Sequence, residues 1–203
     1  MQPGQPSLTA LGAARLCAAH QVLDGASILA DPLAVRILGS DDQASLDHAQ
    51  AHPSGPRLRW FIAARSRIAE DALTVAVDNG ASQLVVLGAG LDTLAYRTPL
   101  ARRVRSYEVD HPATQAWKRE LLSAAAIPVP AGLNFVSIDF ERETLADALK
   151  AAGFDPARRS FFVWLGVVPY LTEQAVFSTL KLYRAAAGRR RRGVRLRQSG
   201  GFD

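Results

Sequence analysis

The spacing of hydrophobic and polar positions along this chain changes near residue 80. Residues 58–79 contain no glycine or proline, and their apolar side chains predict a long helix packed against the rest of the molecule. Beyond this point, short continuous apolar runs alternate with helix-compatible segments. Continuous apolar runs are typical of parallel strands buried on both faces. The pattern therefore predicts a parallel, doubly wound α/β sheet.

The expected elements can be placed by their apolar runs and their breaker residues. Four strands are predicted at 84–87, 104–109, 133–138 and 161–165. Further helices are predicted at 11–23, 111–126, 144–152 and 172–187. Asp31 followed by Pro32 predicts an additional helix start, with the aspartate as its cap.

Composition and charge narrow the class of protein. The 203 residues are 48% hydrophobic, as in ordinary globular proteins, and carry a net charge of +5. That charge comes from residues 188–203, which hold six arginines and one acid. Neither a membrane span nor a signal peptide is recognisable, and Cys17 is the single cysteine. We therefore expect a cytoplasmic protein with no membrane or nucleic-acid partner.

A glycine turn follows the first predicted strand, in the sequence VLGAGLDT. Gly88 and Gly90 permit a tight turn and a close approach of the backbone to a ligand. A dinucleotide-binding turn would carry a third glycine where this chain has Thr93. S-adenosylmethionine has no phosphate to accommodate, so the threonine favours S-adenosylmethionine over NAD. An ordinary strand-to-helix turn remains the simpler alternative.

Acidic residues end the next two predicted strands. Asp110 lies 20 residues after Gly90, the spacing that places a carboxylate beside ribose hydroxyls. Glu108 competes for that role, and we expect one of the two to be only a helix N-cap. At the end of the third strand, Asp139 can accept a hydrogen bond from an adenine amine, and Phe140 can pack on the ring; an ordinary strand-end aspartate is equally compatible.

Two further segments bear on the same site. Gly166, after the fourth strand, allows close approach of the backbone where the methyl-donor end of the cofactor would lie. Trp164 and Tyr170 nearby are expected to be core residues. Arg65, on the long helix, has a planar guanidinium suited to a carboxylate, although a solvated arginine face explains the same pattern.

Together these motifs resemble the leucine carboxyl methyltransferase family, especially its bacterial S-adenosylmethionine-dependent methyltransferases. The segments that carry the resemblance are DPLA (31–34), ARSR (64–67), VLGAGLDT (86–93), YEVDHP (107–112), IDF (138–140) and WLGVVPYL (164–171). The resemblance runs from about residue 8 to residue 182. It implies a class I, Rossmann-like methyltransferase fold with an N-terminal helical cap.

The resemblance also implies roles for individual residues. Arg65 would hold the cofactor carboxylate, Gly88 would contact its methionine part, and Asp110 would bind the ribose. Asp139 and Phe140 would contact the adenine. Family members related to the eukaryotic enzyme carry a glutamate where this chain has Leu165, so small-molecule O-methylation is a better expectation than methylation of a protein C-terminus.

The resemblance predicts a domain organisation in which the sheet lacks its last strands. We expect a helical cap at 1–60, an incomplete S-adenosylmethionine-binding domain at 61–187 and an aberrant or disordered arginine-rich tail at 188–203. A fold of this class has about seven strands, whereas four are marked here. One hypothesis is that a frameshift replaced the remaining strands by the tail, and the other is a tail that binds nucleic acid or a membrane surface.

The functional expectation is transfer of a methyl group to an oxygen of a small molecule or a carboxylate. No catalytic base can be named, because the four histidines (His20, His48, His52 and His111) are more often structural or exposed, and only His111 lies near the expected site. No metal is expected, and the oligomeric state is open. The alternatives are a frameshifted remnant that binds cofactor weakly or not at all, and a nicotinamide-dependent oxidoreductase.

Overall fold

A four-stranded parallel sheet forms the centre of the molecule. The computed structural model describes residues 7–39, 47, 55–139, 143–168 and 172–187. The strands are β1 (Gln83–Leu87), β2 (Arg105–Asp110), β3 (Leu133–Ser137) and β4 (Ser160–Trp164). They lie in the order β3-β2-β1-β4, and every neighbouring pair is parallel. This arrangement confirms the predicted Rossmann-like α/β fold.

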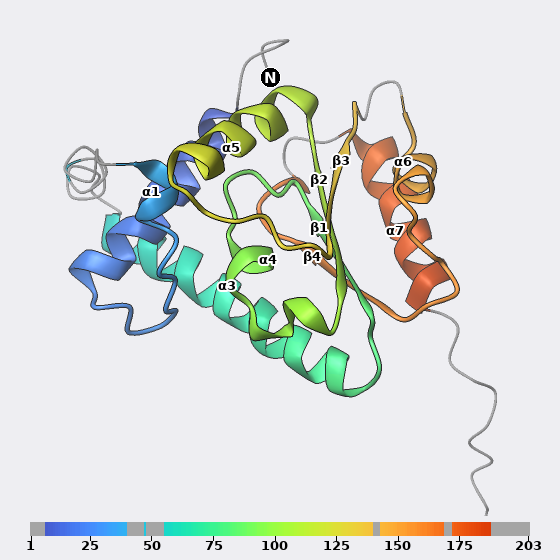
Figure 1. Ribbon diagram of the computed structural model, residues 1–203, viewed down its shortest axis with the longest axis horizontal. Helices are drawn as coiled ribbons and strands as arrows, with labels where there is room; N and C mark the ends of the chain where they lie inside the picture. Colours follow the sequence, from blue (N-terminus) through green and yellow to red (C-terminus); the bar gives the residue numbers. More distant parts are fainter. Residues whose placement is uncertain (1–6, 40–46, 48–54, 140–142, 169–171, 188–203) are drawn as a thin grey trace, which may run out of the picture.

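Helices cover both faces of this sheet. The helices are α1 (Leu8–Leu23), α3 (Gly55–Asp78), α4 (Leu94–Arg97), α5 (Pro112–Ala124), α6 (Leu145–Ala151) and α7 (Glu173–Ala187), with short 3-10 turns η1 (Arg36–Leu38) and η2 (Pro99–Arg102). Figure 1 shows α6 and α7 on one face, with α1, α3, α4 and α5 on the opposite side. None of the helices that the structure describes combines the length and the apolar character that crossing a bilayer requires.

Alternation along the central strand divides the core into two layers. In β1, Leu84 and Val86 pack with Leu73 of α3, whereas Val85 and Leu87 pack with Leu149 of α6. All five residues of β1 are buried, which explains why the strand reads as a continuous apolar run. Burial of both faces leaves the strand ends as the part of the sheet open to ligands.

The register of the sheet brings the carboxyl ends of the strands to one edge. Leu87 at the end of β1 pairs with Val109 of β2 and with Trp164 of β4, and Asp110 pairs with Ser137 of β3. The chain runs from β1 outward to β3 on one side and then returns to β4 on the other side of β1. Ligands of doubly wound sheets bind at such a reversal point, outside the carboxyl ends.

The structure corrects one local expectation and adds one observation about helix length. Asp31 does not cap an α-helix: residues 32–35 form a turn, followed by η1, and the Asp31 carboxylate accepts the N–H of Leu33 at 3.0 Å within that turn. The helix after the glycine turn is also short, because α4 spans only four residues before Pro99 begins η2. The arginine-rich tail at 188–203 lies outside the described residues.

Candidate functional site

The glycine turn leaves β1 in a backbone conformation that favours glycine. Gly88 has a φ of +63° and Gly90 a φ of +44°, both in the left-handed region. The space beside them is also filled: a Cβ atom on Gly88 would lie 2.3 Å from Val167 Cγ2, and one on Gly90 would lie 2.9 Å from Ala10 Cβ. The turn is therefore clamped between the segment after β4 and the first turn of α1.

Asp110, the predicted ribose ligand, is bound to this turn. Its carboxylate accepts the N–H of Gly90 at 2.6 Å through Oδ2 and the N–H of His111 at 2.7 Å through Oδ1. Burial raises the pKa of Asp110 above its usual range, and the two backbone donors oppose that shift. Each carboxylate oxygen keeps a lone pair for a further donor, so the residue can both shape the turn and bind a ligand hydroxyl.

Glu108 has a structural role instead. Its carboxylate lies 2.8 Å from Lys118 Nζ through both oxygens and accepts the Tyr96 hydroxyl at 3.0 Å. Both charged side chains are fully buried. Desolvation raises the pKa of Glu108, and the ammonium of Lys118 opposes the rise. Glu108 therefore joins β2 to α5 and is not a competing ribose ligand in this arrangement.

The expectation that Glu108 or Asp110 caps the next helix is wrong. His111 is the N-cap of α5: its Nδ1 accepts the N–H of Ala113 at 3.3 Å. His20 is fully buried, and its Nε2 accepts the N–H groups of Ile28 and Leu29. The Nδ1 of His111 is thus engaged as an N-cap, and His48 and His52 lie outside the described residues.

Arg65 occupies an unusual environment for an arginine. It projects from α3 so that a Cβ on Gly166 would lie 2.7 Å from its Nη1. Its Nε is buried and has no hydrogen-bond partner among the described residues. Desolvation lowers the pKa of Arg65, and the nearby Asp92 carboxylate opposes this. By contrast Arg67, two residues on, is exposed and pairs with Asp71, so it is a solvated arginine of this helix.

The segment after β4 connects the predicted residues. Gly166 lies under the Arg65 guanidinium and the adjacent Val167 lies over Gly88, so Arg65 and the glycine turn flank the same two residues. Gly166 has a φ of +76°, a second reason for glycine there. Arg65, Gly88 and Asp110 are thus brought to one edge of the sheet, as the sequence predicts.

Asp139 lies next to this group. The N–H of Ile138 donates to the carbonyl oxygen of Asp110 at 3.0 Å, which places Asp139 immediately beyond the end of β3. Its own N–H donates to Glu143 at 3.2 Å. Phe140, the predicted partner of the adenine ring, lies outside the described residues.

The aromatic residues near β4 lie away from the turn. Trp164 packs with the layer of α6 and lines a cavity of about 220 Å³ between β4 and α7. The cavity lining is mainly apolar and aromatic, with hydroxyl groups from Thr179 and Tyr183, and none of the predicted cofactor residues lines it. Leu165 packs against the opposite layer. Tyr170 lies outside the described residues.

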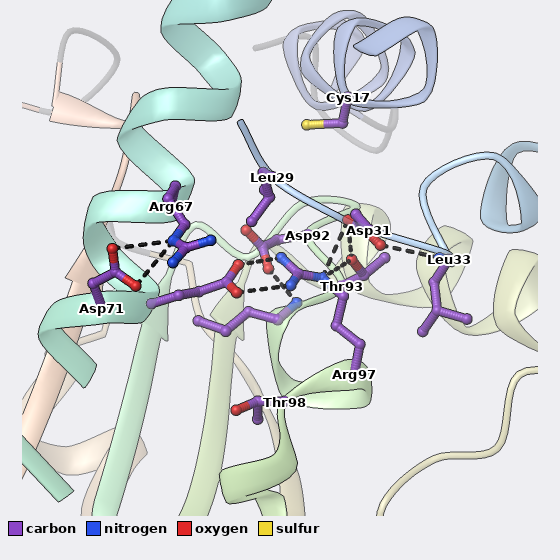
Figure 2. Close-up of polar contacts among 12 residues, drawn as sticks. Cys17, Leu29, Asp31, Leu33, Arg67, Asp71, Asp92, Thr93, Arg97 and Thr98 are labelled. Atoms are coloured by element: carbon purple, nitrogen blue, oxygen red, sulfur yellow. Dashed lines mark hydrogen bonds and ion pairs between the residues drawn. The ribbon is translucent and has the colours of Figure 1, made fainter. Parts of the chain in front are cut away.

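A buried polar network at the turn was not anticipated from the sequence. Figure 2 shows Asp31, Thr93 and Arg97 joined side by side, although Asp31 precedes the other two by more than sixty residues. The sequence marks Thr93 only as a missing glycine and Asp31 only as a helix cap and a member of the DPLA segment. Local periodicity carries no signal for a contact between such distant segments.

The charge around the turn favours a cationic ligand. Asp92, Asp110 and Asp139 follow three neighbouring strands at this edge; the half-buried Arg65 lies near Asp92, and the buried Lys118 lies near Asp110. Desolvation, with the carboxylates of Asp92 and Asp31, raises the pKa of the Cys17 thiol to about 12, so the thiol stays protonated. Within the described part of the chain, no cluster of His, Cys, Asp and Glu could hold a metal.

Comparison with known proteins agrees with this geometry. The family model described as leucine carboxyl methyltransferase matches residues 10–183. A Bacillus subtilis protein, YktD, provisionally named an S-adenosyl-L-methionine-dependent methyltransferase, is 41% identical over 112 residues, which cover 55% of this chain and 36% of YktD. A protein of Mycobacterium sp. (strain KMS) with the same provisional activity is 37% identical over 135 residues, covering 65% of this chain and 45% of its own.

A third relative shows the same partial overlap. A protein of Mycobacterium bovis (strain BCG / Pasteur 1173P2), again provisionally named an S-adenosyl-L-methionine-dependent methyltransferase, is 36% identical over 155 residues. The match covers 71% of this chain and 43% of that protein. The chain thus spans less than half the length of the curated relatives it matches.

Proposed function

Because this chain belongs to the leucine carboxyl methyltransferase family, we propose that its glycine turn binds S-adenosylmethionine for methyl transfer. The observation that carries this proposal is the buried Nε of Arg65, which has no partner among the described residues and lies beside Gly166 at the reversal point of the sheet. A buried guanidinium N–H without a partner is costly, and a ligand carboxylate would satisfy it. S-adenosylmethionine carries such a carboxylate at its methionine end.

The surrounding charges support a sulfonium ligand over a dinucleotide. A pyrophosphate would bring two negative charges towards Asp92 and Asp110, which the short-range repulsion of like charges disfavours. The sulfonium and the amino group of S-adenosylmethionine are both positive. Thr93 adds a second argument, because its side chain is buried and occupied with Asp31 where a phosphate-binding turn needs glycine. A nicotinamide-dependent oxidoreductase is therefore disfavoured.

Each predicted residue has a task in this proposal. S-adenosylmethionine supplies an electrophilic methyl group when bound. Arg65 holds its carboxylate, Gly88 lets the backbone approach the methionine part, and Asp110 accepts a ribose hydroxyl while it keeps Gly90 in place. Asp139, with Phe140, would receive the adenine. The work of these residues is to fix the methyl carbon in position and to keep water away from it.

We propose that the acceptor is an oxygen of a small molecule, such as a carboxylate or a phenolate. An acceptor that is already ionised needs little help from a base. Leu165 supports this choice, since its aliphatic side chain packs in the core where eukaryotic-type members carry glutamate. Residues 1–60 would form the cap over the acceptor.

Titration calorimetry of S-adenosylmethionine into the 203-residue chain tests the proposal. Arg65→Met should weaken binding at least about tenfold, because it removes a charge-assisted hydrogen bond from a buried site. Arg67→Met is the matched control, since Arg67 lies on the same helix but is exposed and paired with Asp71. Labelled methyl donor, incubated with candidate carboxylic acids and phenols, then identifies the product.

Three results would contradict the proposal. Binding that is equally weak in Arg65→Met and Arg67→Met would show that the buried Nε does not face the ligand. Tighter binding of NAD than of S-adenosylmethionine would favour the oxidoreductase. A folded chain that binds neither would favour a remnant without cofactor affinity.

A further inference from the structure

A buried network of three side chains joins the glycine turn to the loop after α1. The Thr93 hydroxyl donates to Asp31 Oδ2 at 2.5 Å, and Arg97 Nε lies 3.1 Å from Thr93 Oγ1 and 3.3 Å from Asp31 Oδ2. The side chains of Asp31 and Arg97 are only 6% and 10% exposed. Figure 2 shows the three side chains converging between the glycine-turn segment and the loop that carries Asp31.

Two members of this network, Asp31 and Arg97, are also bonded to helices outside it. The backbone N–H of Asp31 donates to Gln21 Oε1 at 2.7 Å, which fixes its loop to α1. Arg97 binds both carboxylate oxygens of Glu70 on α3, with Nη1 at 2.9 Å from Oε2. The network therefore holds three segments that are far apart in the sequence at one point.

We propose that Asp31, Thr93 and Arg97 are positioning residues that hold the glycine turn in its ligand-binding conformation. The ligand named here, S-adenosylmethionine, rests on the proposed function above. None of the three touches the ligand in this proposal. They act through the turn at 88–92, which Thr93 follows directly.

The geometry at the two ends of the turn supports this role. The middle of the turn is held at Gly90 by Asp110, at 2.6 Å, and its far end is held at Thr93 by Asp31. Thr93 is also the N-cap residue of α4, yet its side chain makes no capping bond. The hydroxyl donates to Asp31, and Asp92 accepts the N–H of Leu94 in its place, at 2.6 Å. The Thr93 hydroxyl thus joins the turn to the loop of Asp31 and does not cap α4.

The charge balance indicates what loss of Asp31 would do. Arg97 faces two carboxylates, those of Asp31 and Glu70, and its own side chain is only 10% exposed. Asp31→Asn keeps one acceptor oxygen where the carboxylate has two, one for the N–H of Leu33 and one for the Thr93 hydroxyl, so when the amide oxygen stays with Leu33 the hydroxyl loses its acceptor. A buried hydroxyl without an acceptor gains by moving towards another partner. The turn that ends at Thr93 would move with it.

The test uses Asp31→Asn and Thr93→Val, which keep side-chain shape, with Thr93→Ser as the conservative variant that retains the hydroxyl. Asp71→Asn is the matched control, because it breaks the exposed pair with Arg67 that lies close by in Figure 2. Two quantities are measured in the 203-residue chain: the hydrogen-exchange rate of amides 88–93 without ligand, and the dissociation constant of S-adenosylmethionine by calorimetry at a temperature where each variant is folded.

We expect exchange at 88–93 to accelerate about tenfold in Asp31→Asn and Thr93→Val, with S-adenosylmethionine affinity reduced about tenfold. Thr93→Ser and Asp71→Asn should stay within about twofold of the parent chain in both measurements. If Asp31→Asn does not fold, Thr93→Val carries the test, because it leaves the Asp31–Arg97 pair intact.

The outcomes separate this proposal from the proposed function. Exchange and affinity that are unchanged in both variants would overturn the positioning role, as would a loss of thermal stability with no change in the affinity of the folded protein. Faster exchange at 88–93 in a chain that binds no S-adenosylmethionine would support the positioning role and contradict the proposed cofactor. Failure of Thr93→Ser to restore the parent values would also overturn it.

Discussion

Replacement of Gly88 by alanine would test both reasons why the turn requires glycine. The φ of +63° lies in the left-handed region, where an L-residue costs about 1–2 kcal/mol. The added Cβ would also lie 2.3 Å from Cγ2 and 3.0 Å from Cγ1 of Val167, and overpacking of this kind costs about 1–3 kcal/mol. Gly88→Ala should therefore lower the free energy of unfolding by about 2–5 kcal/mol.

A second glycine separates the two contributions. Gly25 has a similar φ of +58°, but a Cβ there would meet nothing within 4 Å. Gly25→Ala should therefore lose only the backbone contribution, about 1–2 kcal/mol. Val167→Ala in the Gly88→Ala background should remove the contact and recover about 1–3 kcal/mol relative to the sum of the single variants.

Urea unfolding of the parent chain and the four variants, followed by circular dichroism, measures these differences. Calorimetric titration with S-adenosylmethionine should in addition show weaker binding in Gly88→Ala than in Gly25→Ala. The reasoning would be refuted if Gly88→Ala were no more destabilising than Gly25→Ala. It would also be refuted if Val167→Ala gave no recovery, since the segment after β4 would then not lie over the turn.

Two further predictions concern buried charges. Glu108→Leu should lower the free energy of unfolding by about 3–5 kcal/mol, because it leaves the Lys118 ammonium buried without its carboxylate partner. The double variant Glu108→Leu, Lys118→Met should recover much of that loss in urea unfolding. Additive losses in the double variant would contradict the pairing. Hydrogen bonds from Arg59 hold the pKa of Asp24 well below its usual range, so this contribution to stability is complete above the unfolded pKa of about 4 and is lost as the pH falls below it. The difference in unfolding free energy between the parent chain and Asp24→Asn should therefore shrink between about pH 5 and pH 2, and a difference independent of pH would contradict this assignment.

Local sequence was sufficient for the parts of the site that follow strand ends. Gly88, Asp110 and Asp139 each come directly after or at the end of a buried strand, and parallel strands bring their carboxyl ends to one edge. Once the alternation of strands and helices is recognised, the convergence of these residues follows from topology alone. Arg65 lies on a helix, so it was named only for its planar guanidinium, and the resemblance to the family supplied its role.

Topology alone does not predict the different roles of Glu108 and Asp110. The two residues share one face of β2, so the alternation of side chains along a strand treats them alike. Their depth in the sheet separates them, because Glu108 lies within reach of Lys118 from α5 while Asp110 reaches the turn. Which of the two carboxylates binds Lys118 depends on how α5 packs against β2. No local sequence pattern encodes the distance between Lys118 and each carboxylate.

The amino-acid sequence by itself determined the parallel sheet, the glycine turn and the acidic residues at the strand ends, because each depends on neighbours within a few positions. Only the tertiary structure decided that Arg65 has a buried Nε, that Val167 lies over Gly88 and that Asp31 meets Thr93 and Arg97. Asp31 and Thr93 are 62 residues apart, and both sit in irregular segments. Contacts of this kind form when separate elements pack together, so their energy is set by the whole fold. The spacing of apolar and polar residues along the chain therefore does not predict them.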